Sequence, residues 1–198
     1  MKKFFINLFL TTIIILNCTL FVYSNENSKI NFLGNNYNLI FSSKGKSNGY
    51  FNEYIQNGQT LSAWNDLIIV HHFPNAKDSL TEAKKIAGFI TAIYAKQNKK
   101  APVVISYNDK KNEAIVDYIL PIKDKKTKKL KCLEFNVFKY QKYSYGKGVI
   151  AFQYSKRFYP SEIKEEKIFQ ENLKILRNKS LNSMTQIVIP NIIAKDIR

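Results

Sequence analysis

The chain has few of the residues that mark special classes of protein. Its 198 residues include two cysteines, seven glycines, five prolines, one tryptophan and two histidines. So few glycines and prolines exclude collagen-like and low-complexity chains, and two cysteines exclude a disulfide-rich scaffold. No phosphate-binding loop or glycine-rich dinucleotide fingerprint is present. The common sequence signatures of nucleotide-binding enzymes and NAD-dependent enzymes are therefore missing.

Acidic residues and arginine are also scarce. The chain has 31 Lys and Arg residues against 15 Asp and Glu residues, which gives a formal net charge of +16. Only three of the basic residues are arginines, namely Arg157, Arg177 and Arg198. Arginine is the side chain that most often reads base edges, so an excess made of lysine gives no reason to expect a nucleic-acid partner. The charge favours an anionic partner of another kind.

The N-terminus has the pattern of a secretory signal peptide over residues 1–24. Lys2 and Lys3 precede an apolar run over residues 4–16, and Val22-Tyr23-Ser24 is a plausible cleavage sequence. We predict cleavage near Ser24, which would make the protein periplasmic or secreted. Residues 25–198 then form a single domain, long enough to bury a core without disulfide bonds.

Two other fates of the N-terminus stay open. Ile15-Leu16-Asn17-Cys18 resembles a bacterial lipobox, although Asn17 replaces the usual small residue, so Cys18 is a candidate for lipidation. Residues 4–23 are also long enough for an uncleaved membrane anchor. With cleavage near Ser24, Cys132 is the only cysteine left, and no neighbouring residue would activate it. We interpret Cys132 as a structural thiol.

Hydrophobic periodicity divides the rest of the chain into strands and helices. Apolar residues at helical spacing follow Ser79, which forms a capping box with Glu82, and a second helix follows Pro160 with Ser161 as a candidate N-cap. Extended segments begin with a hairpin over residues 30–41 and continue over 50–55, 67–73, 103–107, 114–122, 132–140 and 149–158. With the hairpin counted as one extended segment, the order is three strands, a helix, four strands and a helix.

This order predicts an α+β domain. Short turns between strands favour a mostly antiparallel sheet of about six to seven strands, with two amphipathic helices covering one of its faces. The sequence contains no internal repeat and no flexible linker, so we predict no second domain.

One short motif resembles a pattern found in uncharacterised exported bacterial proteins. It reads E-Y-x-x-x-G-x-T-L-x-x-W and consists of Glu53, Tyr54, Gly58, Thr60, Leu61 and Trp64. The order of elements is similar to the Mog1/PsbP-like fold, a sheet sandwiched by helices. That resemblance implies a binding or assembly role, and it transfers no catalytic residue. The residues themselves indicate structure: Gly58 suits a turn, and Trp64 suits a core anchor.

Positive charge is concentrated in the middle of the chain. Residues 96–147 contain 14 lysines and five acidic residues. A predicted hairpin tip carries five of these lysines, which form a candidate patch for an anionic partner: Lys125, Lys126, Lys128, Lys129 and Lys131. The alternative is that lysines in strand turns serve only to prevent aggregation.

Two hypotheses about function follow. In the first, the chain is an exported, non-catalytic envelope or secreted protein that binds a partner protein or an anionic envelope component, with contact to a membrane surface. In the second, it is an envelope hydrolase or transferase whose site is assembled from scattered residues. We expect no cofactor and no metal. His71 and His72 are adjacent in a predicted strand, so their side chains point to opposite faces and cannot grip one ion together.

Overall fold

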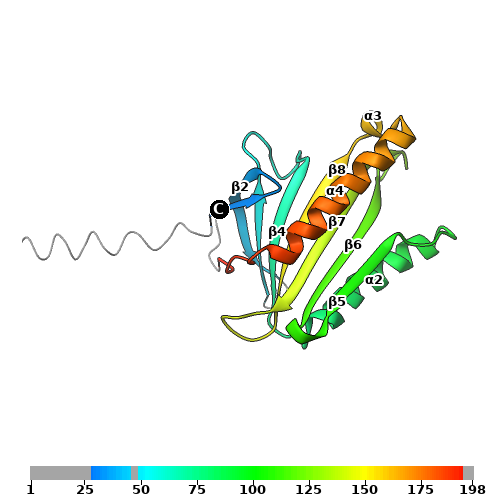
Figure 1. The fold of residues 1–198 in the computed structure, drawn as a ribbon. Helices are drawn as coiled ribbons and strands as arrows, with labels where there is room; N and C mark the ends of the chain where they lie inside the picture. The colour runs from blue at the N-terminus through cyan, green and yellow to red at the C-terminus, as the bar shows by residue number, and fades with distance from the viewer. Residues whose placement is uncertain (1–27, 46–48, 194–198) are drawn as a thin grey trace, which may run out of the picture.

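The computed structural model describes residues 28–45 and 49–193. These residues form a single sheet with two long helices (Figure 1). The elements in chain order are β1 (Lys29–Phe32), β2 (Asn35–Lys44), β3 (Tyr50–Ile55), β4 (Asp66–Phe73), α2 (Ser79–Ala95), β5 (Val103–Asn108), η1 (Asp109–Lys111), β6 (Glu113–Lys123), β7 (Leu130–Lys142), β8 (Val149–Phe158), α3 (Pro160–Ile163) and α4 (Glu166–Gln186).

The sheet has eight strands in the order β1-β2-β3-β4-β8-β7-β6-β5. Every neighbouring pair is antiparallel. The predicted α+β class and antiparallel sheet are confirmed, and the strand count is slightly higher than predicted. The difference arises at the hairpin predicted over residues 30–41, which the predicted order counts as one extended segment. It forms two strands, β1 and β2, joined by a tight turn at Leu33-Gly34.

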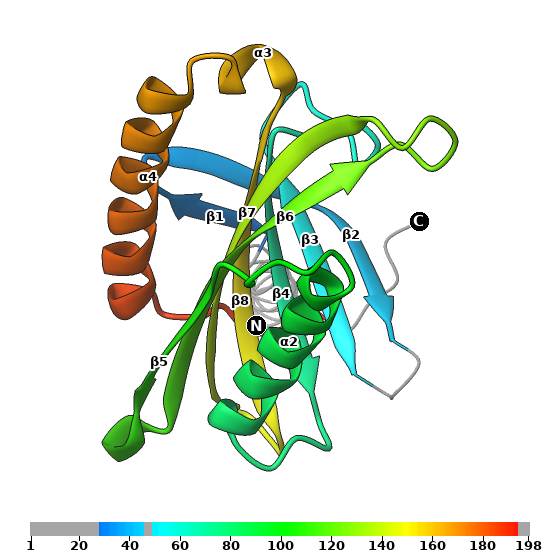
Figure 2. The same cartoon turned by 90° about the vertical axis from the view of Figure 1, so that its right-hand side faces the viewer.

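The two long helices lie on opposite faces of the sheet (Figure 2). The prediction that both cover one face is wrong. Alternate residues of β7 show the reason: Phe135 and Val137 belong to the core beneath α4, whereas Phe138 and Tyr140 belong to the core beneath α2. Because successive side chains of a strand point to opposite faces, a strand that is apolar at both sets of positions needs cover on both faces.

Helix α2 has the predicted stripe but a different cap. Ala83, Ala87 and Ile90 are buried against the sheet. The N-cap is Asp78 rather than Ser79, and its carboxylate accepts a hydrogen bond from the backbone N–H of Thr81 at 2.7 Å. A carboxylate at this position satisfies a backbone donor that the first helical turn leaves unpaired.

The segment after α4 completes the cover of the α4 face. Ile189 is buried in the core on this face. At the end of the described chain, the backbone N–H of Ile193 donates to Asn52 Oδ1 at 2.7 Å, and the Asn52 amide donates back to the carbonyl of Ile193 at 2.9 Å. Asn52 is fully buried in β3, so this reciprocal pair anchors residues 187–193 across the sheet.

The predicted signal peptide, with Lys2, Lys3, Cys18 and Ser24, lies outside the described residues. Among the helices of the described ranges, none combines the length and apolar character needed to cross a membrane.

Candidate functional site

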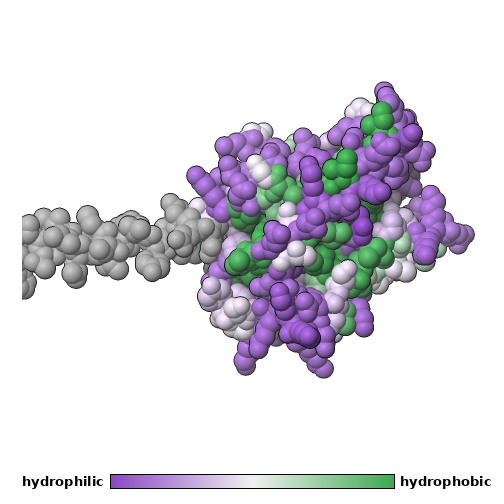
Figure 3. All heavy atoms as spheres, in the orientation of Figure 1, coloured by the Kyte–Doolittle hydropathy of each residue, from purple (hydrophilic) through white to green (hydrophobic). Residues whose placement is uncertain are grey.

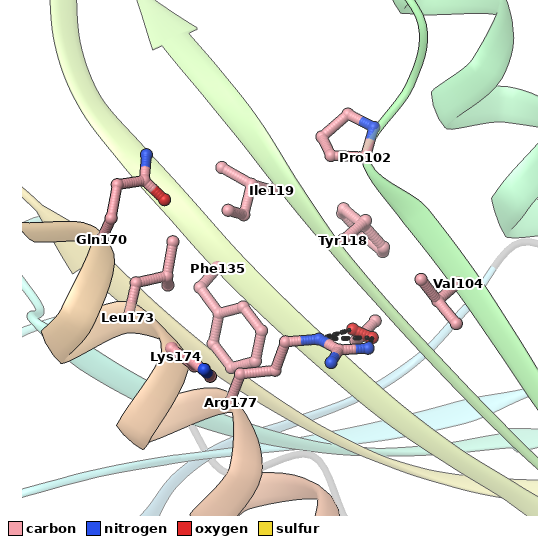
Figure 4. Close-up of a pocket in the computed structure, with 10 residues that line it drawn as sticks. Pro102, Val104, Tyr118, Ile119, Phe135, Gln170, Leu173, Lys174 and Arg177 are labelled. Carbon is pink, nitrogen blue, oxygen red and sulfur yellow. Dashed lines mark hydrogen bonds and ion pairs between the residues drawn. The ribbon is translucent and has the colours of Figure 1, made fainter.

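A pocket of about 270 Å³ lies between α4 and strands β5, β6 and β7 (Figure 4). Phe135 and Leu173 are buried beside it, and Val104 from β5 is 49% exposed at its edge. The space-filling view shows hydrophobic surface next to α4 on this face of the sheet (Figure 3). The lining residues are Pro102, Val104, Asp117, Tyr118, Ile119, Phe135, Gln170, Leu173, Lys174 and Arg177. Most of them are apolar, so the pocket suits an apolar group.

Asp117 and Arg177 both line this pocket and form an ion pair there, and Figure 4 marks the contacts of the Arg177 guanidinium with dashed lines. Arg177 Nε is 2.6 Å from Asp117 Oδ1, and Nη2 is 2.8 Å from Oδ2, which makes the pair bidentate. The hydrogen bonds to Asp117 raise the pKa of the Arg177 guanidinium above its ordinary value. A planar guanidinium matches a carboxylate in this geometry, so each charge neutralises the other and neither group is left free for proton transfer.

Sequence reasoning missed this pair. The two residues are 60 positions apart and lie on different elements, β6 and α4. A signal was nevertheless present, because Asp117 is the one charged residue between Ala114 and Ile122, in an otherwise apolar strand. A buried carboxylate requires a cationic partner, and Arg177 is one of only three arginines.

Four of the five lysines of the predicted patch lie in the turn between β6 and β7, Lys131 is the second residue of β7, and all five are exposed. Asp124 organises this tip, because its Oδ1 accepts hydrogen bonds from the backbone N–H groups of Thr127 at 2.8 Å and Lys126 at 3.0 Å. These bonds lower the pKa of the Asp124 carboxyl. Lys131 Nζ lies 3.9 Å from Asp124 Oδ2. The other four lysines form no ion pair with any residue of the described ranges.

The residues of the motif are divided between core and surface. The buried ones are Tyr54, beneath α4, and Trp64, in a small separate cluster. Gly58 has φ +80°, a left-handed conformation that favours glycine. Thr60 and Leu61 are exposed in the turn that follows, and Glu53 is half-buried in β3.

Trp64 connects the motif to strand β8. Its ring packs in a cluster with Ile55 and Leu67, and the guanidinium carbon of Arg157 lies 3.5 Å from the ring centroid. Arg157 Nε also donates to Glu134 Oε2 at 3.2 Å. A guanidinium placed over an indole face gains a cation–π attraction. The arrangement explains the tryptophan as part of the packing around β8.

Glu53 yields a prediction about stability and pH. Burial raises the pKa of its carboxyl, so folding favours the protonated form. The ionised side chain therefore costs stability at neutral pH, and the cost disappears below the ordinary pKa of a free glutamate. We expect Glu53→Gln to raise the melting temperature at pH 7 and to leave it unchanged below about pH 4. Thermal melts across this range test the prediction, with the exposed Glu171→Gln as the control. A gain that is equal at all pH values would contradict it.

The two histidines point to opposite faces of the sheet. His71 Nε2 lies 2.8 Å from Gln153 Oε1, and burial lowers the pKa of the His71 imidazole. His72 Nε2 lies 3.0 Å from the carbonyl oxygen of Lys147. Within the described residues, no group of three His, Cys, Asp or Glu side chains lies close enough to hold a metal ion.

Gln153 extends the contact of His71 into a polar chain across β8 and β7. Its amide donates to Asn136 Oδ1 at 3.2 Å, and the Asn136 amide donates to Glu134 Oε1 at 3.3 Å. These side chains hold one another in place on the same face of the sheet as α2, because Asn136 pairs with Tyr118 and Gln153 with Phe138. Asn136 is almost fully buried, and its partners satisfy the hydrogen-bonding groups that burial removes from water.

Cys132 is buried at the start of β7 and forms no disulfide bond within the described residues. Burial raises the pKa of its thiol. The thiolate is the nucleophilic form, so this shift disfavours a catalytic role at neutral pH.

Comparison with known proteins gives one match. A protein-family model matches residues 24–189, which include every strand and helix of the structure. No curated protein and no solved structure matches the chain. The resemblance to Mog1/PsbP-like proteins and the resemblance carried by the motif therefore stay predictions.

Proposed function

We propose a binding function for this chain, which belongs to the uncharacterised family whose model matches it over residues 24–189. In this proposal it is an exported, non-catalytic protein that binds an anionic component of the cell envelope. The observation that carries the proposal is the hairpin tip between β6 and β7, which presents Lys125, Lys126, Lys128, Lys129 and Lys131 to solvent.

The geometry of the tip supports an electrostatic contact. The turn is held by the side chain of Asp124, so the lysines start from a defined backbone. Lys128 has φ +60°, and this left-handed residue reverses the chain within the tip. Positive side chains gathered at one end of a long hairpin can approach an anionic surface without the rest of the domain intervening. Each lysine near a charged membrane contributes about 1 kcal/mol.

The N-terminal sequence supports a location beside such a surface. The family match begins at residue 24, which is Ser24, the residue near which we predict cleavage. Cleavage, lipidation of Cys18 and anchoring by residues 4–23 all imply export, and bacterial envelopes contain anionic lipids and polymers. The lipid headgroups of the membrane are the component that we test.

The non-catalytic part of the proposal rests on the pocket beside α4. Its carboxylate and its guanidinium, Asp117 and Arg177, are bound to each other. A catalytic acid or base has to exchange a proton with substrate, and a carboxylate in a bidentate ion pair is poorly placed to do so.

Salt dependence of vesicle binding tests the proposal. We expect the processed protein, recovered from cells that express it, to co-sediment with vesicles containing phosphatidylglycerol and not with vesicles of phosphatidylcholine alone. Binding should fall steeply between about 0.01 M and about 1 M salt, because the Debye length shortens from ~30 Å to ~3 Å. Equal binding to both kinds of vesicle, or binding that salt does not weaken, would refute an electrostatic contact.

A further inference from the structure

Strand β5 forms an exposed edge of the sheet (Figure 1). Its only partner in the described residues is β6, so one side of its backbone has free hydrogen-bonding groups. Natural proteins usually protect such edges with charged residues, prolines or very short strands. The sequence of β5, Val-Val-Ile-Ser-Tyr-Asn, contains no charge and no proline. The opposite edge, β1, is protected by its length of four residues.

The apolar pocket opens beside this edge. Val104 belongs to β5 and also lines the pocket, and Pro102 lines it just before the strand begins. Val104 is paired with Asp117, so its side chain lies on the face that carries α4. A strand added to β5 would lie ~4.8 Å beyond it. From there, a long apolar side chain on the α4 face can lean over Val104 toward the pocket.

Lysines bracket the edge at both ends. Lys99 and Lys100 precede β5, and Lys110 and Lys111 follow it in η1. Lys174 adds a further charge at the pocket. These five lysines, which we call the β5 lysines, are exposed, and none forms an ion pair with a described residue. A strand lying along β5 would therefore have positive charge at each end and uncharged residues between.

We propose that β5 and the adjoining pocket bind an extended segment of a partner protein, which adds to the sheet as a ninth strand. The free backbone edge supplies main-chain hydrogen bonds, and the pocket accepts a side chain from alternate positions, as in other cases of strand addition. The segment has an apolar residue on the α4 side and acidic residues at both ends. This inference is independent of the membrane contact proposed for the hairpin tip.

Charge excludes a second copy of this chain as the occupant. If two β5 strands paired antiparallel, Lys99 and Lys100 of one copy would lie beside Lys110 and Lys111 of the other. Like charges placed opposite each other across a strand pair are destabilising, and each copy carries a formal net charge of +16. An acidic segment from another protein turns the same lysines into attractive contacts.

Selection from a displayed peptide library tests the proposal. The probe is a phage library of random peptides of about ten residues, long enough to cover β5 with both flanks. We expect the wild-type protein to enrich peptides with alternating apolar residues and acidic ends. The Val104→Glu variant, which puts a carboxylate at the mouth of the pocket, should bind the enriched peptides at least tenfold more weakly. Substitution of all five β5 lysines with Gln should also weaken binding at least tenfold.

Two controls make the result specific. Replacement of the five lysines of the hairpin tip with Gln removes the same charge elsewhere, and it should leave peptide binding unchanged. Hydrogen exchange on the complex should show new protection of amides in β5 and none in β1. No enrichment, enrichment of basic peptides, or equal binding by wild type and Val104→Glu would overturn the proposal. Val104 is half exposed, and a thermal melt of each variant verifies that it is folded.

Discussion

Replacement of Lys125, Lys126, Lys128, Lys129 and Lys131 with Gln should lower the affinity for phosphatidylglycerol vesicles by roughly a thousandfold or more. Five lysines at about 1 kcal/mol each give about 5 kcal/mol, and each 1.4 kcal/mol is a factor of about ten. The melting temperature should change little, because exposed charges contribute little to stability. Co-sedimentation at low salt measures the affinity, and a thermal melt measures the stability.

The β5 lysines provide the matched control. Substitution of Lys99, Lys100, Lys110, Lys111 and Lys174 with Gln removes the same number of charges and should retain most of the vesicle binding. If both variants lose binding equally, net charge alone attracts the protein to the membrane, and the tip has no special role. If the tip variant binds like the wild type at low salt, its lysines serve only solubility.

The second large effect concerns the ion pair in the pocket. Arg177→Ala should lower the free energy of unfolding by about 3 kcal/mol, because the Asp117 carboxylate then stays buried without a partner. Burial is what makes the effect large: the side chain of Asp117 is 5% exposed, whereas that of Arg177 is 38% exposed. The exposure of Arg177 places our value at the lower end of what is found for broken buried pairs.

Denaturant titration of a variant series separates this cost from simple loss of packing. Removal of both charges, as in Asp117→Leu with Arg177→Met, should recover most of the stability, because apolar residues replace a buried pair at little net cost. A loss below about 1 kcal/mol in Arg177→Ala would mean that water reaches Asp117 and that the pair is a surface contact.

Local sequence patterns were sufficient for most of the secondary structure. Ala83, Ala87 and Ile90 repeat at helical spacing and are buried in α2. The alternating residues of 114–122 and 132–140 form β6 and β7, with one residue added at each end of β6 and two at each end of β7. The lysines of the hairpin tip and its turn were also evident from the sequence. In each case the information lies within a few residues of the chain, because helix and strand periods are local properties.

Elements with weak local patterns were predicted less well. Helix α4 continues to Gln186, beyond the stripe of Phe169, Leu173 and Leu176 that predicted it. Its last turns contain many polar residues, and packing of Met184 against the sheet explains their helical state. Tertiary contacts override weak local preferences in such segments.

The sequence by itself determined the α+β class, the antiparallel pairing and the exposed basic tip, because period and turn residues act over short distances. Only the tertiary structure decided that α2 and α4 take opposite faces, that Asp117 meets Arg177, and that β5 is left at an edge beside an apolar pocket. Those features join residues separated by tens of positions. Their pairing depends on which faces remain to be buried once all eight strands are in place.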